Sequence, residues 1–252
     1  MTSGSSGKER DAVYFVSDAH FGLGDDGRRV ELFAELAAQM RGRAAALYIA
    51  GDLFDFWIEY RRTIRSDYFR VLHELRALVE AGVSVHYAAG NHDFALGRFL
   101  EETVGIKISR GCIDVELQGR EVHICHGDRI RKRYVFKIAD RLLGNKTLQA
   151  VYRMIHPDIG VSLGAFCSAV LKERNRKPNV PSRNVKVCRQ AAQALVKTGK
   201  SDLVIFAHTH YAERIKYDGG EYCNIGSWVN NYDYAVLRGG EIQLLKWGNS
   251  AS

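Results

Sequence analysis

Apolar runs of strand length alternate with amphipathic helical segments over the first third of the chain. Residues 12–17 (AVYFVS), 46–50 (ALYIA) and 84–89 (SVHYAA) are short, apolar and typical of buried strands. Apolar side chains at helical spacing lie between them, at about 28–41 and about 66–81. Strands that alternate with helices favour a parallel sheet with helical crossover connections. The start of the chain therefore predicts an α/β fold.

The rest of the chain divides into strand-rich segments and one long helical segment. Residues 129–199 are amphipathic, rich in Leu, Tyr, Phe, Lys and Arg, and interrupted near their prolines. We expect a single domain over 9–248, with a helical cap inserted at about 129–180 and a flexible Gly/Ser-rich lead-in at 1–8. Strand patterns flank the cap at about 112–117, 121–125, 202–207, 212–217, 221–225, 232–237 and 241–247.

The composition is that of an ordinary globular protein. The 252 residues are 46% hydrophobic and 26% charged, which suits one large domain or two small ones. No apolar run reaches the roughly 18 residues that a membrane span needs. The N-terminus lacks the basic and apolar pattern of a signal peptide. We therefore expect a cytoplasmic protein.

Charge and cysteine content narrow the partners and the compartment. A formal net charge of +7 favours an acidic partner, such as a nucleotide, a nucleic acid or an anionic lipid surface. Much of the positive charge lies in and beside the predicted cap. The 5 cysteines are odd in number, widely spaced and without a Cys-x-x-Cys pair. We expect them to be buried, reduced thiols.

Polar motifs follow the predicted strands at five places. Because ligands of α/β proteins bind where the carboxyl ends of strands converge, we expect these motifs to meet at one site. In extended chain, residues two apart face the same way, so each Asp-x-His or His-x-His pair can point into that site. The motifs are Asp18-Ala19-His20, Gly51-Asp52, Gly90-Asn91-His92-Asp93, His126-Gly127-Asp128 and His208-Thr209-His210.

The motifs offer oxygen and imidazole ligands in the number that two adjacent cations need. Carboxylates bridge cations and imidazoles add borderline ligation, and the motifs contain no thiolate, so the set suits cations of the Mn or Fe kind. Mn is the expected metal, and Fe, Mg and Co tolerate the same ligands. The candidate ligands are Asp18, His20, Asp52, Asn91, His126, His208 and His210.

The same motifs resemble the signature of the calcineurin-like metallophosphoesterases. That signature runs Asp-x-His, Gly-Asp-x-x-Asp, Gly-Asn-His-Asp/Glu, His and Gly-His-x-His, and the chain departs from it at Ala207, where Gly is usual. The resemblance implies a four-layer αββα sandwich whose dinuclear metal centre hydrolyses phosphoesters. It also implies that one metal is held by Asp18, His20, Asp52 and His210 and the other by Asp52, Asn91, His126 and His208, with Asp52 bridging.

His92 directly follows the candidate ligand Asn91, so it can lie over a bound substrate without binding metal. We assign it the role of proton donor to the leaving oxygen. Asp93 has two interpretations, since it either orients His92 or is structural.

Within this superfamily the chain is most similar to the UDP-2,3-diacylglucosamine pyrophosphohydrolases of lipid A synthesis. The similarity lies in residues 51–57 (GDLFDFW), in Asn91-His92-Asp93-Phe94, in the position of the helical insert and in Gly226-Ser227-Trp228-Val229. It implies a nucleotide-diphosphate lipid substrate that is cleaved to UMP and a lipid phosphate. Two departures leave a different diphosphate or phosphodiester substrate open. His92 stands where the best-known members have Arg, and residues 129–133 are basic where those members are acidic.

The insert offers features that such a substrate needs. Its apolar residues between 134 and 171 have two interpretations, as a groove for acyl chains or as packing against the core. Its Lys and Arg residues are candidates for contact with the diphosphate or with the anionic inner face of the cytoplasmic membrane, which would make the protein peripheral there. Lys172, Arg174 and Lys177 are the candidate phosphate contacts.

Other functions fit parts of the pattern. A phosphodiesterase or nuclease with another substrate suits the ligands and the net charge, although the insert lacks the Gly/aromatic pattern of a single-strand binding platform. A metal-bearing scaffold without activity suits the basic insert, but all expected ligands and His92 are present. Residues 22–27 (GLGDDG) match the dinucleotide-binding pattern, yet their two carboxylates would repel a pyrophosphate.

Overall fold

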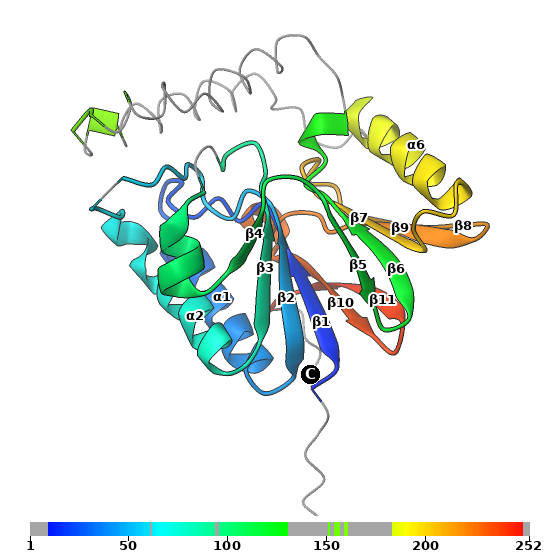
Figure 1. Cartoon of the computed structure of the whole chain (residues 1–252), viewed down its shortest axis with the longest axis horizontal. Coiled ribbons are helices and arrows are strands. Elements are labelled where there is room, and N and C mark those ends of the chain that lie inside the picture. The colour runs from blue at the N-terminus through cyan, green and yellow to red at the C-terminus, as the bar shows by residue number, and fades with distance from the viewer. Residues whose placement is uncertain are drawn as a thin grey trace, which may run out of the picture.

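Two β-sheets form the centre of the fold and carry helices on their outer faces (Figure 1). The computed structural model describes residues 10–60, 62–93, 96–130, 151, 154–156, 159–160 and 183–248. The lead-in predicted at 1–8 and most of the cap predicted at 129–180 lie outside these residues, so both stay predictions. Within the described part of the chain, no helix is long and apolar enough to cross a membrane.

The first sheet contains the parallel strands that the sequence predicts. Its order is β11-β10-β1-β2-β3-β4, and strands β1 to β4 run parallel to one another. β10 joins the other side of β1 as an antiparallel strand and pairs with β11. The strands are β1 (Ala12–Val16), β2 (Ala44–Ala50), β3 (Ser84–Ala88), β4 (Lys107–Ser109), β10 (Asp233–Arg238) and β11 (Glu241–Lys246).

The second sheet mixes parallel and antiparallel pairs in the order β5-β6-β7-β9-β8. β7 runs parallel to both β6 and β9, whereas β5 and β8 pair antiparallel at the two edges. The strands are β5 (Ile113–Leu117), β6 (Arg120–Ile124), β7 (Leu203–Phe206), β8 (Glu213–Tyr217) and β9 (Gly220–Asn224).

Helices cover the outer face of each sheet (Figure 1). α1 and α2 pack on the first sheet, and α6 packs on the second. The layers are therefore α-β-β-α, which confirms the predicted sandwich. The helices are α1 (Gly27–Met40), the 3-10 turn η1 (Ser66–Tyr68), α2 (Phe69–Glu80), the π-helix η2 (Phe99–Val104), the 3-10 turn η3 (Asp128–Ile130), α6 (Arg183–Lys197) and α7 (Trp228–Asn231).

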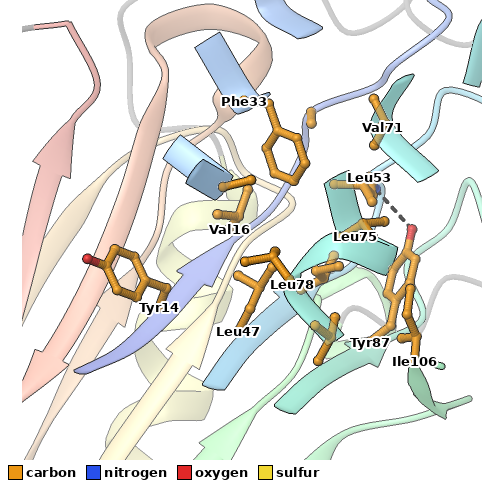
Figure 2. Packing of buried hydrophobic residues seen from close by; sticks show 14 of the residues in the cluster. Tyr14, Val16, Phe33, Leu47, Leu53, Val71, Leu75, Leu78, Tyr87 and Ile106 are labelled. Carbon is orange, nitrogen blue, oxygen red and sulfur yellow. Dashed lines mark hydrogen bonds between the residues drawn. The ribbon is translucent and has the colours of Figure 1, made fainter. Parts of the chain in front are cut away.

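Side chains of the central strands alternate between two cores. In β1, Tyr14 and Val16 belong to the core under α1 and α2, where Figure 2 shows them with Phe33 of α1. Val13 and Phe15 belong instead to the core between the two sheets. Because successive side chains of a strand point to opposite faces, a strand buried on both faces is apolar throughout. This burial holds the strand ends, and the loops that follow them, in fixed positions.

The cysteine prediction is wrong for one pair. Cys188 and Cys223 are buried free thiols, as expected. Cys112 and Cys125 instead form a disulfide, and Cys112 is exposed. Cys112 directly precedes β5 and Cys125 directly follows β6, so the antiparallel pairing of these strands brings the two residues opposite each other. The spacing of the cysteines in sequence did not reveal that register.

A buried ion-pair cluster on the second sheet generates a pH prediction. Buried Glu221 accepts hydrogen bonds from Arg120 (2.5 Å) and Arg214 (2.6 Å). Burial raises the pKa of Glu221, but the two guanidinium groups outweigh burial and the net pKa is lowered. A carboxyl whose pKa is lower in the folded state stabilises the fold above its unfolded pKa of about 4.3 and loses that contribution in more acidic solution.

We expect Glu221→Gln to lower the free energy of unfolding by about 1–3 kcal/mol at pH 7, because hydrogen bonds to a charged acceptor are lost. The difference from the wild type should shrink as the pH falls below about 4. Urea denaturation at a series of pH values measures it, with exposed Glu116→Gln as the matched control. A difference that stays constant from pH 7 to pH 3 would contradict the assignment.

Candidate metal centre

The predicted motifs lie at the carboxyl ends of strands from both sheets. Asp18, Asp52 and Asn91 follow β1, β2 and β3, and His126 and His208 follow β6 and β7. Backbone hydrogen bonds join these loops, for example from Asp18 N to the carbonyl of Gly51 (3.2 Å). The two sheets thus bring loops that are distant in sequence to one edge of the sandwich.

The backbone at five candidate ligands is left-handed. The φ angles are 48° at Asp18, 47° at His20, 53° at Asp52, 64° at His208 and 55° at His210. We expected extended backbone to make the two residues of each pair face the same way, and that is wrong because the backbone is left-handed there. The residues of each pair nevertheless reach one site. Left-handed residues other than Gly cost about 1–3 kcal/mol each and gather at functional sites.

Asp18, His20 and His210 form the first ligand group. One ligand atom from each lies within 4.8 Å of the others. Nε2 of His210 lies 3.1 Å from Oδ1 of Asp18, and Nε2 of His20 lies 3.8 Å from the same oxygen. The amide of Asn230, in α7, contacts Nδ1 of His210 at 3.1 Å. The Nε2 atoms of both imidazoles therefore converge on one carboxylate oxygen.

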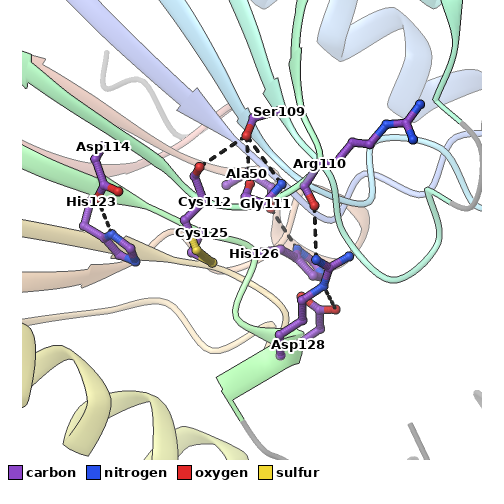
Figure 3. Close-up of a disulfide and its surroundings, with 11 residues drawn as sticks. Ala50, Ser109, Arg110, Gly111, Cys112, Asp114, His123, Cys125, His126 and Asp128 are labelled. Atoms are coloured by element: carbon purple, nitrogen blue, oxygen red, sulfur yellow. Dashed lines mark hydrogen bonds and ion pairs between the residues drawn. A yellow bond between two sulfur atoms is a disulfide. The ribbon is translucent and has the colours of Figure 1, made fainter. Parts of the chain in front are cut away.

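Asp52, Asn91 and His126 form the second group. Nε2 of His126 lies 3.2 Å from Oδ2 of Asp52 and 3.1 Å from Oδ1 of Asn91. The other ring nitrogen, Nδ1, donates a hydrogen bond to the carbonyl of Ala50 (2.8 Å), which is the contact drawn in Figure 3. That contact fixes the tautomer and leaves the lone pair of Nε2 for a metal. Asp18 also lies within ligand distance of Asp52 and His126, so the two groups are contiguous.

His208 lies on the side of the second group. Its ring is in edge contact with the ring of His126, with centroids 5.1 Å apart. Its backbone N–H donates to Oδ2 of Asp18 (3.0 Å). The structure therefore gathers all seven predicted ligands around Asp18 and Asp52, and their roles as ligands stay predictions.

His92 lies beside the two groups and is partly exposed. Its Nδ1 donates to the carbonyl oxygen of Asp55 (2.5 Å), and its backbone N–H donates to Oδ1 of Asp52 (2.8 Å). Its Nε2 lies 4.0 Å from Oδ2 of Asp52. Nδ1 therefore anchors the ring of His92, and Nε2 faces the carboxylate of Asp52.

Of the two interpretations of Asp93, its contacts support the structural one. Its carboxylate accepts hydrogen bonds from Asp52 N (3.0 Å), Gly90 N (2.9 Å) and the hydroxyl of Tyr87 (2.7 Å). The Tyr87 oxygen in turn accepts from Leu53 N (3.1 Å). Burial, together with the nearby Asp52, raises the pKa of Asp93 to about 6. This buried network fixes the loops after β2 and β3 against each other.

The motif glycines leave room for the ligands. A Cβ on Gly90 would lie 2.3 Å from Oδ1 of Asp52, and a Cβ on Gly51 would lie 2.5 Å from Nδ1 of His126. Gly51 also has a φ of 84°. Ala207 stands where the family signature has Gly, and it is tolerated because its φ is not positive.

Burial and mutual interactions shift the pKa values of the ligand groups. Burial raises the pKa of Asp18, but the adjacent His210 imidazole outweighs burial and the net pKa is lowered. The same balance with His126 leaves the pKa of Asp52 well below its usual value. Burial together with repulsion from His126 lowers the pKa of His208 to about 4. Burial lowers the pKa values of His126 and His210, but the adjacent Asp52 and Asp18 carboxylates outweigh burial, so both net pKa values are raised. The buried carboxylates thus draw positive charge to the centre, and a bound cation would supply that charge instead.

These residues fit a pair of divalent cations. Asp18 and Asp52 are 0% and 2% exposed, and among the described residues no Lys or Arg pairs with either carboxylate. Oδ1 of Asp18 and Nδ1 of His20 are buried without a hydrogen-bond partner in the described structure. Burying ionised carboxylates is costly unless cations compensate them. The oxygen and imidazole donors converge in the way that such cations require.

Sequence reasoning missed three residues that support the site. Asp55 holds His92 through its carbonyl, and its Oδ1 lies 3.5 Å from Nδ1 of His20. Asp55 is the second Asp of the Gly-Asp-x-x-Asp motif, and that position could have identified it from the sequence. Tyr87 and Asn230 carried no such signal, because their roles depend on the tertiary fold. The candidate phosphate contacts Lys172, Arg174 and Lys177 lie outside the described residues, so they stay predictions.

Tyr87→Phe tests the buried network behind the site. Two buried partners would each lose a hydrogen bond, so we expect the free energy of unfolding to fall by about 1–3 kcal/mol. Metal retention after dialysis should also fall, because Asp93 would hold the Asp52 loop less firmly. Urea denaturation and elemental analysis measure these effects. Tyr234→Phe, at another buried tyrosine, is the control, and equal behaviour of the two variants would contradict the role of the network.

Comparison with known proteins agrees with the geometry. The pattern of the calcineurin-like phosphoesterases matches residues 12–212. A UDP-2,3-diacylglucosamine hydrolase of Porphyromonas gingivalis is 30% identical, over 93% of this chain and 97% of its own. The protein of that name from Neisseria gonorrhoeae is 30% identical, over 89% of this chain and 92% of its own.

Among solved structures, a novel archaeal phosphodiesterase is 15% identical, with a TM-score of 0.49 over 93% of this chain and 99% of its own. The family match at 12–212 includes all five motifs and both ligand groups described above. The chain belongs to the calcineurin-like phosphoesterase family, whose members are metal-dependent phosphohydrolases.

Proposed function

We propose that this phosphohydrolase cleaves the diphosphate of UDP-2,3-diacylglucosamine, or of a related lipid-linked nucleotide, to give UMP and a lipid phosphate. The observation that carries the proposal is the pair of contiguous ligand groups around the buried carboxylates of Asp18 and Asp52. The substrate assignment is supported by the relatives of that name, which align over nearly the whole chain.

Two Mn ions are the cofactors we propose, with Fe, Mg and Co as the other metals that the ligand set accepts. In this proposal Asp52 would be a ligand to both ions. Support comes from its place after the central strand β2 and from the contacts of its carboxylate with His126 and with the backbone of His92. The first metal would take Asp18, His20 and His210 in addition, and the second Asn91, His126 and His208.

When bound, such cations activate water and stabilise the charge that develops on a phosphoryl group. The protein's own contribution is to hold donors and the substrate in place. The Asp55 carbonyl accepts a hydrogen bond from Nδ1–H of His92, so a proton for donation must be a second one, carried on Nε2 by the imidazolium form beside Asp52. A proton delivered from Nε2 to the leaving oxygen neutralises the charge of the leaving group.

The insert between η3 and α6 is proposed to receive the acyl chains. Among its few described residues, Val151, Met154 and Ile159 are 54%, 85% and 63% exposed. Apolar side chains presented to solvent suit a lipid substrate, and the basic residues of the insert suit its diphosphate or an anionic membrane surface. Contact with the inner face of the cytoplasmic membrane is part of this proposal.

The direct test is hydrolysis by purified, Mn-loaded protein of UDP-2,3-diacylglucosamine in detergent. We expect release of UMP, and its loss in Asp52→Asn. A bis-aryl phosphodiester and a single-stranded oligonucleotide serve as alternative substrates. Turnover of the aryl diester without UMP release would keep the metal centre and reject the lipid substrate. Cleavage of the oligonucleotide with steep salt dependence would favour a nuclease, and metal binding without any turnover would favour a scaffold.

His92→Ala should lower kcat on the diphosphate about 10²–10⁴-fold, which is the usual contribution of general acid catalysis. The loss should be much smaller on an aryl diester, because an aryl oxide leaves without needing a proton. Steady-state kinetics on both substrates and the metal content of the variant measure this. Equal losses on the two substrates, with both metals retained, would contradict the proton-donor role.

A further inference from the structure

Four side chains that can take part in metal binding share one face of the β5–β6 hairpin. Asp114 pairs with His123 in the strand register, and Cys112 and Cys125 lie opposite each other two residues further along each strand. Because strand side chains alternate, these four point to the same side, away from the core between the sheets. Figure 3 shows them grouped at the end of the hairpin. We call Cys112, Asp114, His123 and Cys125 the hairpin cluster.

The donors of the hairpin cluster already lie within reach of one ion. The sulfurs of Cys112 and Cys125 and an imidazole nitrogen of His123 lie within 4.8 Å of one another. Two thiolates in a tetrahedral zinc site are roughly 3.8 Å apart, since each metal–sulfur bond is about 2.3 Å. The Cα atoms of the two cysteines are 4.4 Å apart and Cys112 is exposed. Rotation of the Cys112 side chain after reduction can therefore separate the sulfurs without unpairing the strands.

Asp114 orients His123 in the manner of a metal-bound histidine. Its Oδ1 lies 2.6 Å from Nδ1 of His123, so Nδ1–H donates to the carboxylate and Nε2 is left for a ligand bond. The ring is also in edge contact with Phe206, with centroids 6.0 Å apart. Two cysteines and one histidine form a three-ligand set that zinc accepts when water fills the fourth position.

The space at this face is sufficient for a bound cation. A surface cavity of about 520 Å³ is lined by His123 and both cysteines, and also by Arg129 and Lys200. Two thiolates neutralise a divalent cation, so these basic residues would face a neutral complex. Arg129 is in addition bound to the carbonyl of Arg110 (3.1 Å).

We propose that the reduced protein binds one thiophilic divalent cation of the zinc class through Cys112, His123 and Cys125, separately from the dinuclear centre. A dithiol reductant transfers two electrons and two protons to the Cys112–Cys125 disulfide and becomes a disulfide itself. The cation then replaces the two thiol protons, Nε2 of His123 binds as the third ligand, and water completes the coordination. Oxidation of the two cysteines removes the site. Because the dinuclear ligands include no thiolate, the two sites select different cations.

Co²⁺ distinguishes this site from the dinuclear centre, because thiolate ligands give cobalt a near-ultraviolet charge-transfer band that oxygen and imidazole ligands do not. The full-length protein is reduced with dithiothreitol, desalted without air and loaded with excess Mn before Co²⁺ is titrated in. We expect a thiolate band in the reduced protein that rises with added Co²⁺ to a plateau, and Co²⁺ that displaces Mn from the dinuclear centre adds nothing to this band. The oxidised protein should show none.

Matched variants locate the ligands. Cys112→Ser, at an exposed position, should abolish the band, and Asp114→Asn should weaken Co²⁺ binding about 10–100-fold because the histidine loses its orienting partner. Cys188→Ser, at a buried free thiol, and Asp52→Asn, in the dinuclear centre, should keep the band. Absence of the band in the reduced wild type, or its persistence in Cys112→Ser, would overturn the proposal. Loss of the band in Asp52→Asn would overturn the separation of the two sites.

Discussion

The structure depends on the burial of two carboxylates, Asp18 and Asp52, side by side at the edge of both sheets. An anion in a protein interior is stable when cations and hydrogen bonds compensate it, and among the described residues these two are compensated by imidazoles and backbone N–H groups alone. Divalent cations held by the two ligand groups would supply the missing positive charge. Histidines surround the pair. Burial lowers the pKa values of His20 and His208, so these two imidazoles favour the neutral form that can bind a cation.

The sandwich provides the rigidity that this arrangement needs. Strands buried on both faces fix the points at which the loops begin, and hydrogen bonds such as Ala207 N to His126 O (3.0 Å) join one loop to another. The left-handed backbone at five ligands costs about 1–3 kcal/mol at each residue. The surrounding core offsets that cost and holds the donors converged before a metal arrives, so less of the binding free energy is spent on ordering the loops.

Much of the fold and the centre was predictable from sequence, because apolar runs of strand length mark buried strands and polar motifs at strand ends mark the site. The predicted strands at 12–17, 46–50 and 84–89 correspond to β1, β2 and β3. The three-residue β4 was missed because so short an edge strand carries no periodic signal. The Tyr87–Asp93 network and the Cys112–Cys125 pair were missed for a different reason. Both depend on which strands become neighbours, and local residue patterns do not encode that.

Anomalous diffraction from crystals of the Mn-loaded protein would test the dinuclear account most directly. The account predicts two Mn peaks about 3.5–4 Å apart, with the Asp52 carboxylate between them and Asp18 and His126 on opposite ions. In Asp52→Asn crystals grown under the same conditions, at least one peak should disappear. A single Mn peak in the wild type, or two peaks of which neither contacts Asp52, would contradict the account.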